Sequence, residues 1–502
     1  MIPLPFIRAT VTVIGILGTV YIAAKGIQSG NAILLALPIA FFSGMFFVAN
    51  PAAIIILFVG LKSSMVTLPI LPSGMNLSRC FILAFVGLTC AKALALQDIR
   101  VDKSKVSGLV LLYGGVIVLH MFIRGFGLRI LGGDSWGGVE AIAQLLFVAL
   151  FVFRNSLILT ERQWLFAFIL SVFAASVPMM ADLVYILSHG RIVEQFAFVQ
   201  MITSALLSGY HSPQFGGIWR LQRAAFFGLG MLHLSYFLLV LKRLRPHMFG
   251  ALIGVAALLI GLSGHRLVVA KALVFVFSIY ILRYPGRRVR ATVRLSISMV
   301  LIYITLFFGV RYLPVAIQRS VAFVPGIPVA TLATYDAAGT TKWRIILWKR
   351  SLESWRQYFW VGKGLSIDPQ ELQSVERSMD IARMYGRIPD FFARTIALRD
   401  YHNGPIALLL DLGIGGLLLG LLIPLVLLRE GFKVNDQWVW NSEQLRILHT
   451  ILLANFISQV VIFVMLYGDV RSIMNLLFSG TLLAGIRASD KALAEAHAET
   501  SA

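Results

Sequence analysis

The chain has 502 residues, of which 58% are hydrophobic and only 13% are charged, and its mean hydropathy is +0.83. A soluble domain does not need so much apolar surface, so the composition predicts a polytopic membrane protein. The net charge of +21 could indicate nucleic-acid binding. The Lys and Arg residues, however, stand in short clusters between apolar stretches, as in the loops of membrane proteins, so we expect no nucleic-acid partner.

Apolar stretches suited to membrane helices, which need about 17–25 residues, occur along most of the chain. The predicted spans are residues 9–24, 32–48, 50–61, 80–97, 106–123, 138–153, 163–185, 223–241, 248–263, 266–282, 292–310, 404–428, 445–466 and 471–487. Pro51 could join the second and third into one broken helix. The prediction is therefore an all-α polytopic protein with about 12–14 transmembrane helices.

The basic clusters predict how these helices are oriented. Cytoplasmic loops carry an excess of Lys and Arg, and with this helix count all the clusters fall on one side. They lie at residues 100–105, 154–162, 242–245, 283–294, 429–446 and 487–491. Both termini are then cytoplasmic. The chain divides into an N-terminal helical bundle (1–310), a large periplasmic loop (311–403), C-terminal transmembrane helices (404–487) and a cytoplasmic tail (488–502) that we expect to be frayed.

The loop at 311–403 is too long and too polar to be a simple connection, and such loops are usually functional. Within it, residues 343–359 predict an amphipathic helix, because apolar side chains alternate with basic ones such as Arg344. Gly362-Lys363-Gly364 ends this helix, and residues 369–383 predict a second one.

The loop ends at His402 and Asn403, where the next apolar helix begins. Asn403 is a good N-cap residue, and Pro405 suits the first turn. His402 would stand at the mouth of a membrane helix, where an imidazole can act as a general base. Its simpler interpretation is an interface residue. Gly413 follows about three turns later, on the same side of the helix, and leaves room for a lipid tail or a neighbouring helix.

Several arginines are predicted on the same outer side. Arg266 follows a tight Ser263-Gly264-His265 turn, where it could bind phosphate oxygens or simply anchor the helix at the interface. Arg220 and Arg223 precede another span, and the sequence does not distinguish between them. Arg344 could add to the same positive surface, although loop arginines are usually solvated.

Ionisable residues also fall inside predicted spans, where charges are costly and imply a cavity or a partner. They are Lys92, Asp182, Lys271 and Asp411. We expect Asp411 to face away from His402 and to form a structural ion pair. The histidines lack the spacing of a zinc site, the predicted first outer loop (about 25–31) has no acidic residue, and no phosphate-binding loop is present. The sequence therefore predicts a metal-independent site without a cofactor.

The segment from His402 to Gly416, with its His-Asn start and its glycines, resembles the signature of the O-antigen ligase and O-antigen polymerase superfamily. Gly264-His265-Arg266 is similar to the Gly-Ser-Arg turn of that family. Arg344 with Trp348, followed by Gly362 and Gly364, is similar to its Arg-x-x-x-Trp helix and Gly-x-Gly. The resemblance covers about residues 215–430.

The resemblance implies a glycosyltransferase of the bacterial inner membrane that acts at the periplasmic face. The donor would be an undecaprenyl-pyrophosphate-linked glycan, and the acceptor another lipid-linked glycan (polymerase) or a lipid A core sugar (ligase). His402 would activate the acceptor, while Arg266, assisted by Arg220 or Arg223 and by Arg344, would bind the pyrophosphate. The helix count favours the polymerase. The alternatives are a transporter or flippase for lipid-linked glycans, and a structural component of an assembly.

Overall fold

The structure, a computed structural model, describes residues 51–61, 104–124, 137–187, 214–215, 218–283, 288–365, 367–386 and 390–501. Single residues between these ranges, at 82, 85–87, 89, 102 and 388, are described as well. The predicted spans at 9–24 and 32–48, and most of the span at 80–97, lie outside the described residues.

The N-terminal half is a bundle of apolar helices. These are α3 (Pro51–Leu61), α5 (Lys105–Arg124), α6 (Gly137–Val152), α7 (Glu161–Ala174), α8 (Ser176–Leu187), α11 (Ala224–Val240), α12 (Pro246–Leu262), α13 (Arg266–Arg283) and α14 (Arg288–Gly309). They coincide with the predicted spans, except that the span at 163–185 is divided between α7 and α8. A short antiparallel hairpin of β1 (Gln214–Phe215) and β2 (Ile218–Trp219) precedes α11.

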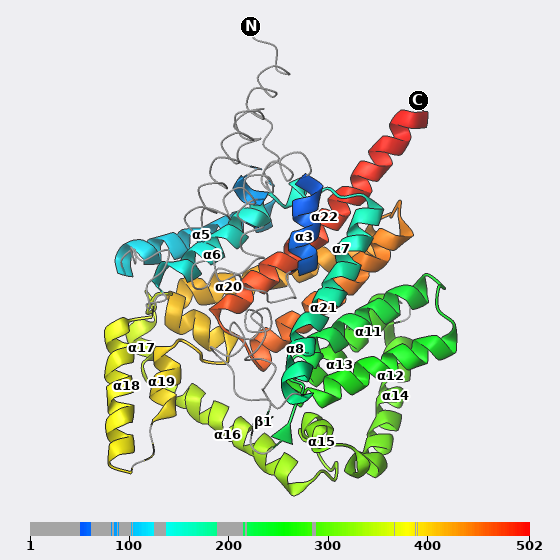
Figure 1. Ribbon diagram of the computed structural model, residues 1–502. Coiled ribbons are helices and arrows are strands. Elements are labelled where there is room, and N and C mark those ends of the chain that lie inside the picture. The colour runs from blue at the N-terminus through cyan, green and yellow to red at the C-terminus, as the bar shows by residue number, and fades with distance from the viewer. Residues whose placement is uncertain are drawn as a thin grey trace, which may run out of the picture.

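The predicted periplasmic loop is folded into helices that lie across one end of the bundle (Figure 1). They are α15 (Val315–Val321), α16 (Thr331–Glu353), α17 (Trp355–Tyr358), α18 (Pro369–Met384) and α19 (Phe391–Ala397). The second predicted helix matches α18 closely. The start of the first predicted helix, residue 343, was too late in the chain, because α16 begins at Thr331. The end of the predicted helix forms a separate short helix, α17.

The C-terminal helices are α20 (Gly404–Gln437), α21 (Glu443–Met465) and α22 (Val470–Ser501). The expectation of a frayed tail after residue 487 was wrong, because α22 continues through it (Figure 1). Asp490 is completely buried. Its carboxylate accepts hydrogen bonds from the Trp438 indole and from the backbone N–H groups of Asn441 and Ser442, each at 3.0 Å. The turn between α20 and α21 thus holds the last helix in place.

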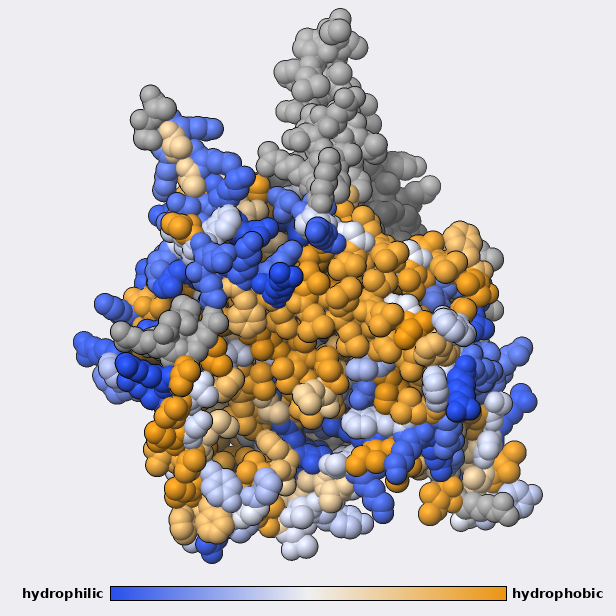
Figure 2. All heavy atoms as spheres, turned by 180° about the vertical axis from the view of Figure 1, so that it is seen from behind, coloured by the Kyte–Doolittle hydropathy of each residue, from blue (hydrophilic) through white to orange (hydrophobic). Residues whose placement is uncertain are grey.

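Among the described residues, five helical segments are long and apolar enough to cross a membrane: Lys105–Arg124, Glu161–Val184, Thr292–Tyr312, Gly404–Gln437 and Glu443–Met465. Figure 2 shows a broad apolar belt across one face of the molecule, with polar side chains on both sides of it. An all-α polytopic membrane fold, as the sequence predicted, explains both observations. The apolar core lies where α20, α21 and α22 pack against α5 and α6.

Candidate active site at the mouth of α20

The site is built around the start of α20. Asn403 is its N-cap, and its side-chain oxygen accepts a hydrogen bond from the backbone N–H of Ile406 at 3.0 Å. Pro405 stands in the first turn, where no intrahelical N–H is needed. The position of this helix start agrees with the sequence, and it fixes where His402 can lie.

His402 is held in an aromatic cage. Its ring stacks on Tyr467, with 5.0 Å between ring centres, and lies 5.3 Å from Trp343. Its backbone is left-handed, with φ of +53°, a conformation that few residue types other than Gly, Asn, Asp and His adopt. The side chain is 20% exposed, so a substrate could still reach it.

Asp400 is the charged partner of His402. Its Oδ1 lies 3.0 Å from Nδ1 of the imidazole, although the approach is off the line of a well-directed hydrogen bond. Burial lowers the pKa of His402 from its ordinary value, Asp400 opposes this, and Arg344 adds to it. Burial also raises the pKa of Asp400. The imidazole is therefore neutral near pH 7 and able to accept a proton.

The turn that carries His402 is fixed from two sides. The indole of Trp348, on α16, donates a hydrogen bond to the carbonyl oxygen of Tyr401 at 3.0 Å. The Tyr401 hydroxyl, itself fully buried, donates to Oδ1 of Asp411 at 3.3 Å. Arg399 is close enough for its charge to act on both. Asp411 therefore belongs to a network that supports the turn, consistent with the structural role expected for it.

Gly413 has a different role from the one predicted. Its φ of +66° and ψ of −167° interrupt α20. The backbone groups freed by this break bond to the segment before α18: Lys363 N–H donates to Leu410 O at 2.7 Å, and Gly364 N–H to Asp411 O at 2.8 Å. On the other side of the break, Ile414 N–H donates to Phe359 O at 2.7 Å. Gly413 is thus the docking point of a backbone loop, where the sequence predicted a space for a lipid tail or a neighbouring helix.

A second group of charges, which we call the arginine cluster, consists of Arg220, Arg266, Arg319 and Asp336. The Asp336 carboxylate pairs with both Arg220, at 3.3 Å, and Arg319. Arg319 also donates to the carbonyl oxygen of Gly264. The hydrogen-bond partners of Arg266 are two neutral hydroxyls on α16, those of Thr340 and Thr341, at 2.8 and 3.1 Å.

The arginine cluster has more positive than negative charge. Burial and the repulsion by Arg319 together lower the pKa of Arg220 to about 10, although Asp336 opposes both. His265, in the turn before Arg266, has its pKa lowered to about 4 by burial and by Arg319, Arg220 and Arg344. Arginines that repel one another in a half-buried site favour binding of an anion, which would relieve that repulsion.

Arg223 lies apart from the arginine cluster. Its guanidinium pairs with Asp182 of α8 at 2.5 Å, and its backbone N–H donates to the same carboxylate at 2.9 Å. Of the two arginines that the sequence left undecided, Arg220 is thus the one in the cluster. The pairing also explains how the charge of Asp182 is accommodated within a predicted span.

Arg344 lies between the arginine cluster and His402. It projects from α16, which also carries Asp336, Thr340 and Trp348, and its guanidinium lies 5.6 Å from the centre of the Tyr467 ring. Its charge lowers the pKa of both His402 and His265. Within the described part of the chain, Arg344 has no ion-pair partner. It is therefore available to an anionic ligand placed between the two groups.

Several residues of the site were missed from the sequence. Arg319 and Asp336 are separated by a helix end and a loop, and no local pattern marks them as a pair. Asp400, two residues before His402, could have been recognised from the sequence. Tyr467 and Trp343 could only be found from the folded chain. Among the described residues there is no group of three His, Cys, Asp or Glu side chains that could hold a metal ion.

Residues 251–421 match the model of a family described as O-antigen ligase. The matched region extends from α12 into α20, so it contains Arg266, Arg319, Arg344 and His402. Over these residues the chain is similar to the O-antigen ligase family, in agreement with the resemblance of its sequence motifs. Comparison with curated proteins gives no match. The match points to a function of the O-antigen ligase type, and the apolar helices of the chain agree with a location in a membrane.

Proposed function

We propose that the protein transfers glycan from a polyprenyl-pyrophosphate-linked donor to an acceptor hydroxyl at the periplasmic face of the membrane. The observation that carries this proposal is that one helix, α16, faces both the His402 turn and the arginine cluster, with Arg344 between them. A general base and a site for a diphosphate are thus joined by one rigid element, as transfer from a diphosphate donor requires.

Arg266 and Arg220 bind the donor pyrophosphate in this proposal, and Arg319 and Arg344 extend the positive surface. Arg266 exchanges its neutral hydroxyl partners for phosphate oxygens, and planar guanidinium groups fit such oxygens well. Asp336 keeps Arg220 and Arg319 in position when no donor is bound. The arginines stabilise the charge that grows on the leaving pyrophosphate, which makes a divalent metal unnecessary.

His402 is the base. The acceptor oxygen attacks the anomeric carbon, the bond from that carbon to the phosphate oxygen breaks, and the acceptor proton moves to Nε2 of His402. The polyprenyl pyrophosphate leaves with the bonding electrons. Asp400, next to Nδ1, favours the tautomer with its proton on Nδ1 and stabilises the imidazolium that forms. Attack from the side opposite to the pyrophosphate inverts the anomeric carbon.

Polymerase and ligase differ only in the acceptor. We favour the polymerase on the large number of predicted spans, with ligation to a lipid A core sugar as the second candidate. The site residues serve both reactions equally. The chemical identity of the product, a longer lipid-linked glycan or a glycosylated lipid A core, distinguishes them.

The test is a transfer assay with purified protein in detergent, where transport across a membrane has no meaning. The substrate is polyprenyl-pyrophosphate-linked oligosaccharide, offered alone or with lipid A core, and the products are separated by mass. Arg266→Gln and Arg344→Gln should greatly decrease transfer. Arg350→Gln is the control, because Arg350 lies on the same helix as Arg344 but pairs with Asp390 at the surface, at 2.7 Å. An unchanged donor with the native protein would favour the flippase instead.

A further inference from the structure

A cavity lies at the other end of α20, far from His402. Leu427, Glu430 and Val434 of α20 line it, together with Leu483 and Arg487 of α22 and His449 of α21. The cavity is small and partly open to solvent. The basic clusters of the sequence place this end of the bundle on the cytoplasmic side, so the cavity has no part in the proposed transfer.

Arg154 is the deepest charged group in the cavity wall and is only 1% exposed. Its Nη2 pairs with Asp102 and donates to the Ser104 hydroxyl at 2.9 Å. Its Nε and Nη1 find no hydrogen-bond partner among the described residues. Buried guanidinium donors are seldom left in this state, because losing water without gaining an acceptor is costly.

Two further polar groups of the cavity are also short of partners. Nδ1 of His449 is buried without a hydrogen bond in the described structure, and the residue is 2% exposed. Arg487 contacts the Trp438 ring, with 5.9 Å from its guanidinium carbon to the ring centre, and has no ion-pair partner there. Glu430 is the one acidic residue of the lining. The cavity therefore offers two guanidinium groups and an imidazole to an anion, and one carboxylate to a cation.

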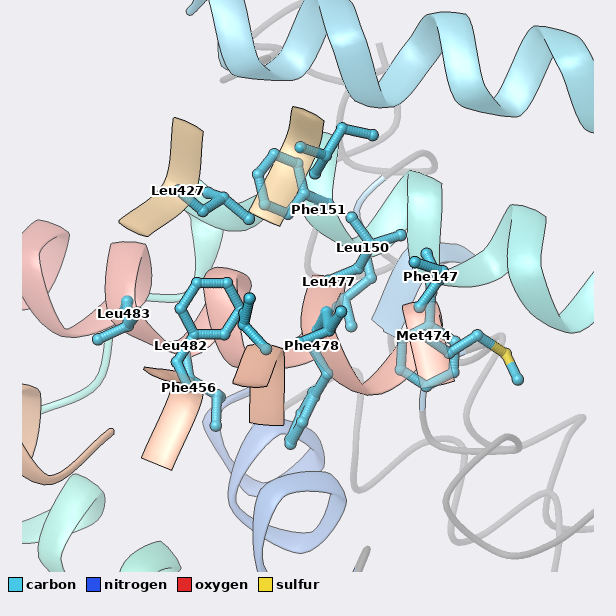
Figure 3. Packing of buried hydrophobic residues seen from close by; sticks show 14 of the residues in the cluster. Phe147, Leu150, Phe151, Leu427, Phe456, Met474, Leu477, Phe478, Leu482 and Leu483 are labelled. Carbon is cyan, nitrogen blue, oxygen red and sulfur yellow. The ribbon is translucent and has the colours of Figure 1, made fainter. Parts of the chain in front are cut away.

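The remaining walls are apolar. Figure 3 shows Leu427, Leu483 and Phe151 in the core where α6, α20, α21 and α22 meet. The guanidinium carbon of Arg154 lies 4.0 Å from the centre of the Phe151 ring. A free ion would leave these walls without a partner, whereas an amphiphile would cover them with its chain.

We propose that this cavity binds a phospholipid whose headgroup carries both a phosphate and a primary ammonium. Arg154, Arg487 and His449 take the phosphate oxygens, Glu430 takes the ammonium, and the leucines contact the start of the acyl chains. The headgroup then supplies hydrogen-bond partners to the buried nitrogen atoms of Arg154 and His449 that lack them. Asp102 remains paired with Nη2 of Arg154.

The test is native mass spectrometry of the full chain, released from nanodiscs of phosphatidylethanolamine, phosphatidylcholine and phosphatidylglycerol in equal amounts. Phosphatidylethanolamine should be retained in preference to both others. Arg487→Gln and Glu430→Gln should each reduce its retention roughly tenfold, as the loss of a charge-assisted hydrogen bond predicts. Ala484→Leu, which fills the cavity without changing a charge, should reduce it similarly.

The matched control is Lys491→Gln. Lys491 lies one turn beyond Arg487 on α22 and pairs with Glu495 at the surface, at 3.6 Å, so the variant should retain the lipid as the native chain does. Thermal unfolding and gel filtration verify that each variant is folded. Equal retention of the three lipids, or native retention by Arg487→Gln, would overturn the proposal. Full displacement of the lipid by soluble phosphoethanolamine would overturn the assignment to a lipid and leave a site for the free headgroup.

Discussion

Asp400 places its Oδ1 3.0 Å from Nδ1 of His402, two residues further along the same turn. The carboxylate raises the pKa of the imidazole, and burial together with Arg344 lowers it. Since burial is the largest of these effects, the free enzyme holds a neutral imidazole with Nε2 ready to accept a proton. This relationship sets the expected pH dependence of the reaction.

Transfer should depend on pH with an acidic limb below 6.5, the ordinary pKa of His. A lowered pKa keeps the base deprotonated as the pH falls, so activity is lost only at a pH below that value. Asp400→Asn removes the group that raises the pKa of His402 and should shift the limb further towards acid. The measurement is kcat/KM against pH, which reports the free enzyme. A limb that moves to higher pH in Asp400→Asn would refute this assignment.

Arg220 and Arg223 should respond differently to the same substitution. Arg220→Gln removes a proposed donor ligand and should lower transfer by a factor of about 10 to 100, the loss of one strong charge-assisted contact. Arg223→Gln leaves the buried Asp182 unpaired and should cost about 3 kcal/mol of stability, while the folded fraction remains active. Transfer assays and thermal unfolding, performed on both variants, separate these effects. The reverse pattern would place Arg223 at the donor.

Gly264→Ala should damage the donor site. Gly264 has φ of +67°, and a Cβ there would lie 2.8 Å from Cδ of Arg220. The strain of the left-handed backbone, about 1–2 kcal/mol, adds to a displacement of Arg220, so KM for the donor should rise. Gly254→Ala, in the preceding helix α12, is the control because its Cβ would meet nothing within 4 Å. Equal effects of the two substitutions would contradict the close approach of Gly264 to Arg220.

Gly413→Ala should prevent the docking of the loop on α20. The backbone of Gly413 lies in a region that is essentially restricted to glycine, and a Cβ would lie 2.5 Å from the Trp360 carbonyl oxygen. We expect a loss of about 3 kcal/mol or more, seen as a lower unfolding temperature in detergent. Gly415→Ala should have little effect, since its nearest contact would be Val116 at 3.8 Å. A fully stable Gly413→Ala protein would show that α20 does not need the break.

Most of the helices, and the position of His402 at the start of one of them, could be predicted from the sequence. Features that depend on tertiary contacts could not. Apolar spans and an N-cap such as Asn403 are local features, and they mark α20 without reference to the rest of the chain. In the sequence, Gly413 looks like a glycine that lets helices pack closely. The loop that docks at the helix break comes from residues 359–364, so no local pattern around Gly413 reveals it.

Ion pairs between distant segments cannot be predicted from a local sequence pattern either. Asp336 is one of several acidic residues on a long polar loop, and only the folded chain brings it between Arg220 and Arg319. The choice between Arg220 and Arg223 was open for the same reason. Both arginines precede α11, but Arg220 pairs with a carboxylate on α16 and Arg223 with one on α8.

The most direct measurement of the central claim is the turnover of a His402→Asn variant with purified polyprenyl-pyrophosphate-linked oligosaccharide. Asparagine tolerates the left-handed backbone at this position, with φ of +53°, so the turn should persist while the base is lost. We expect kcat to fall by about 10²- to 10⁴-fold, the usual contribution of a general base, with donor binding by the arginine cluster little changed. A variant that transfers glycan within about threefold of the native rate, well short of a general base's contribution, would contradict the assignment of His402 as the base.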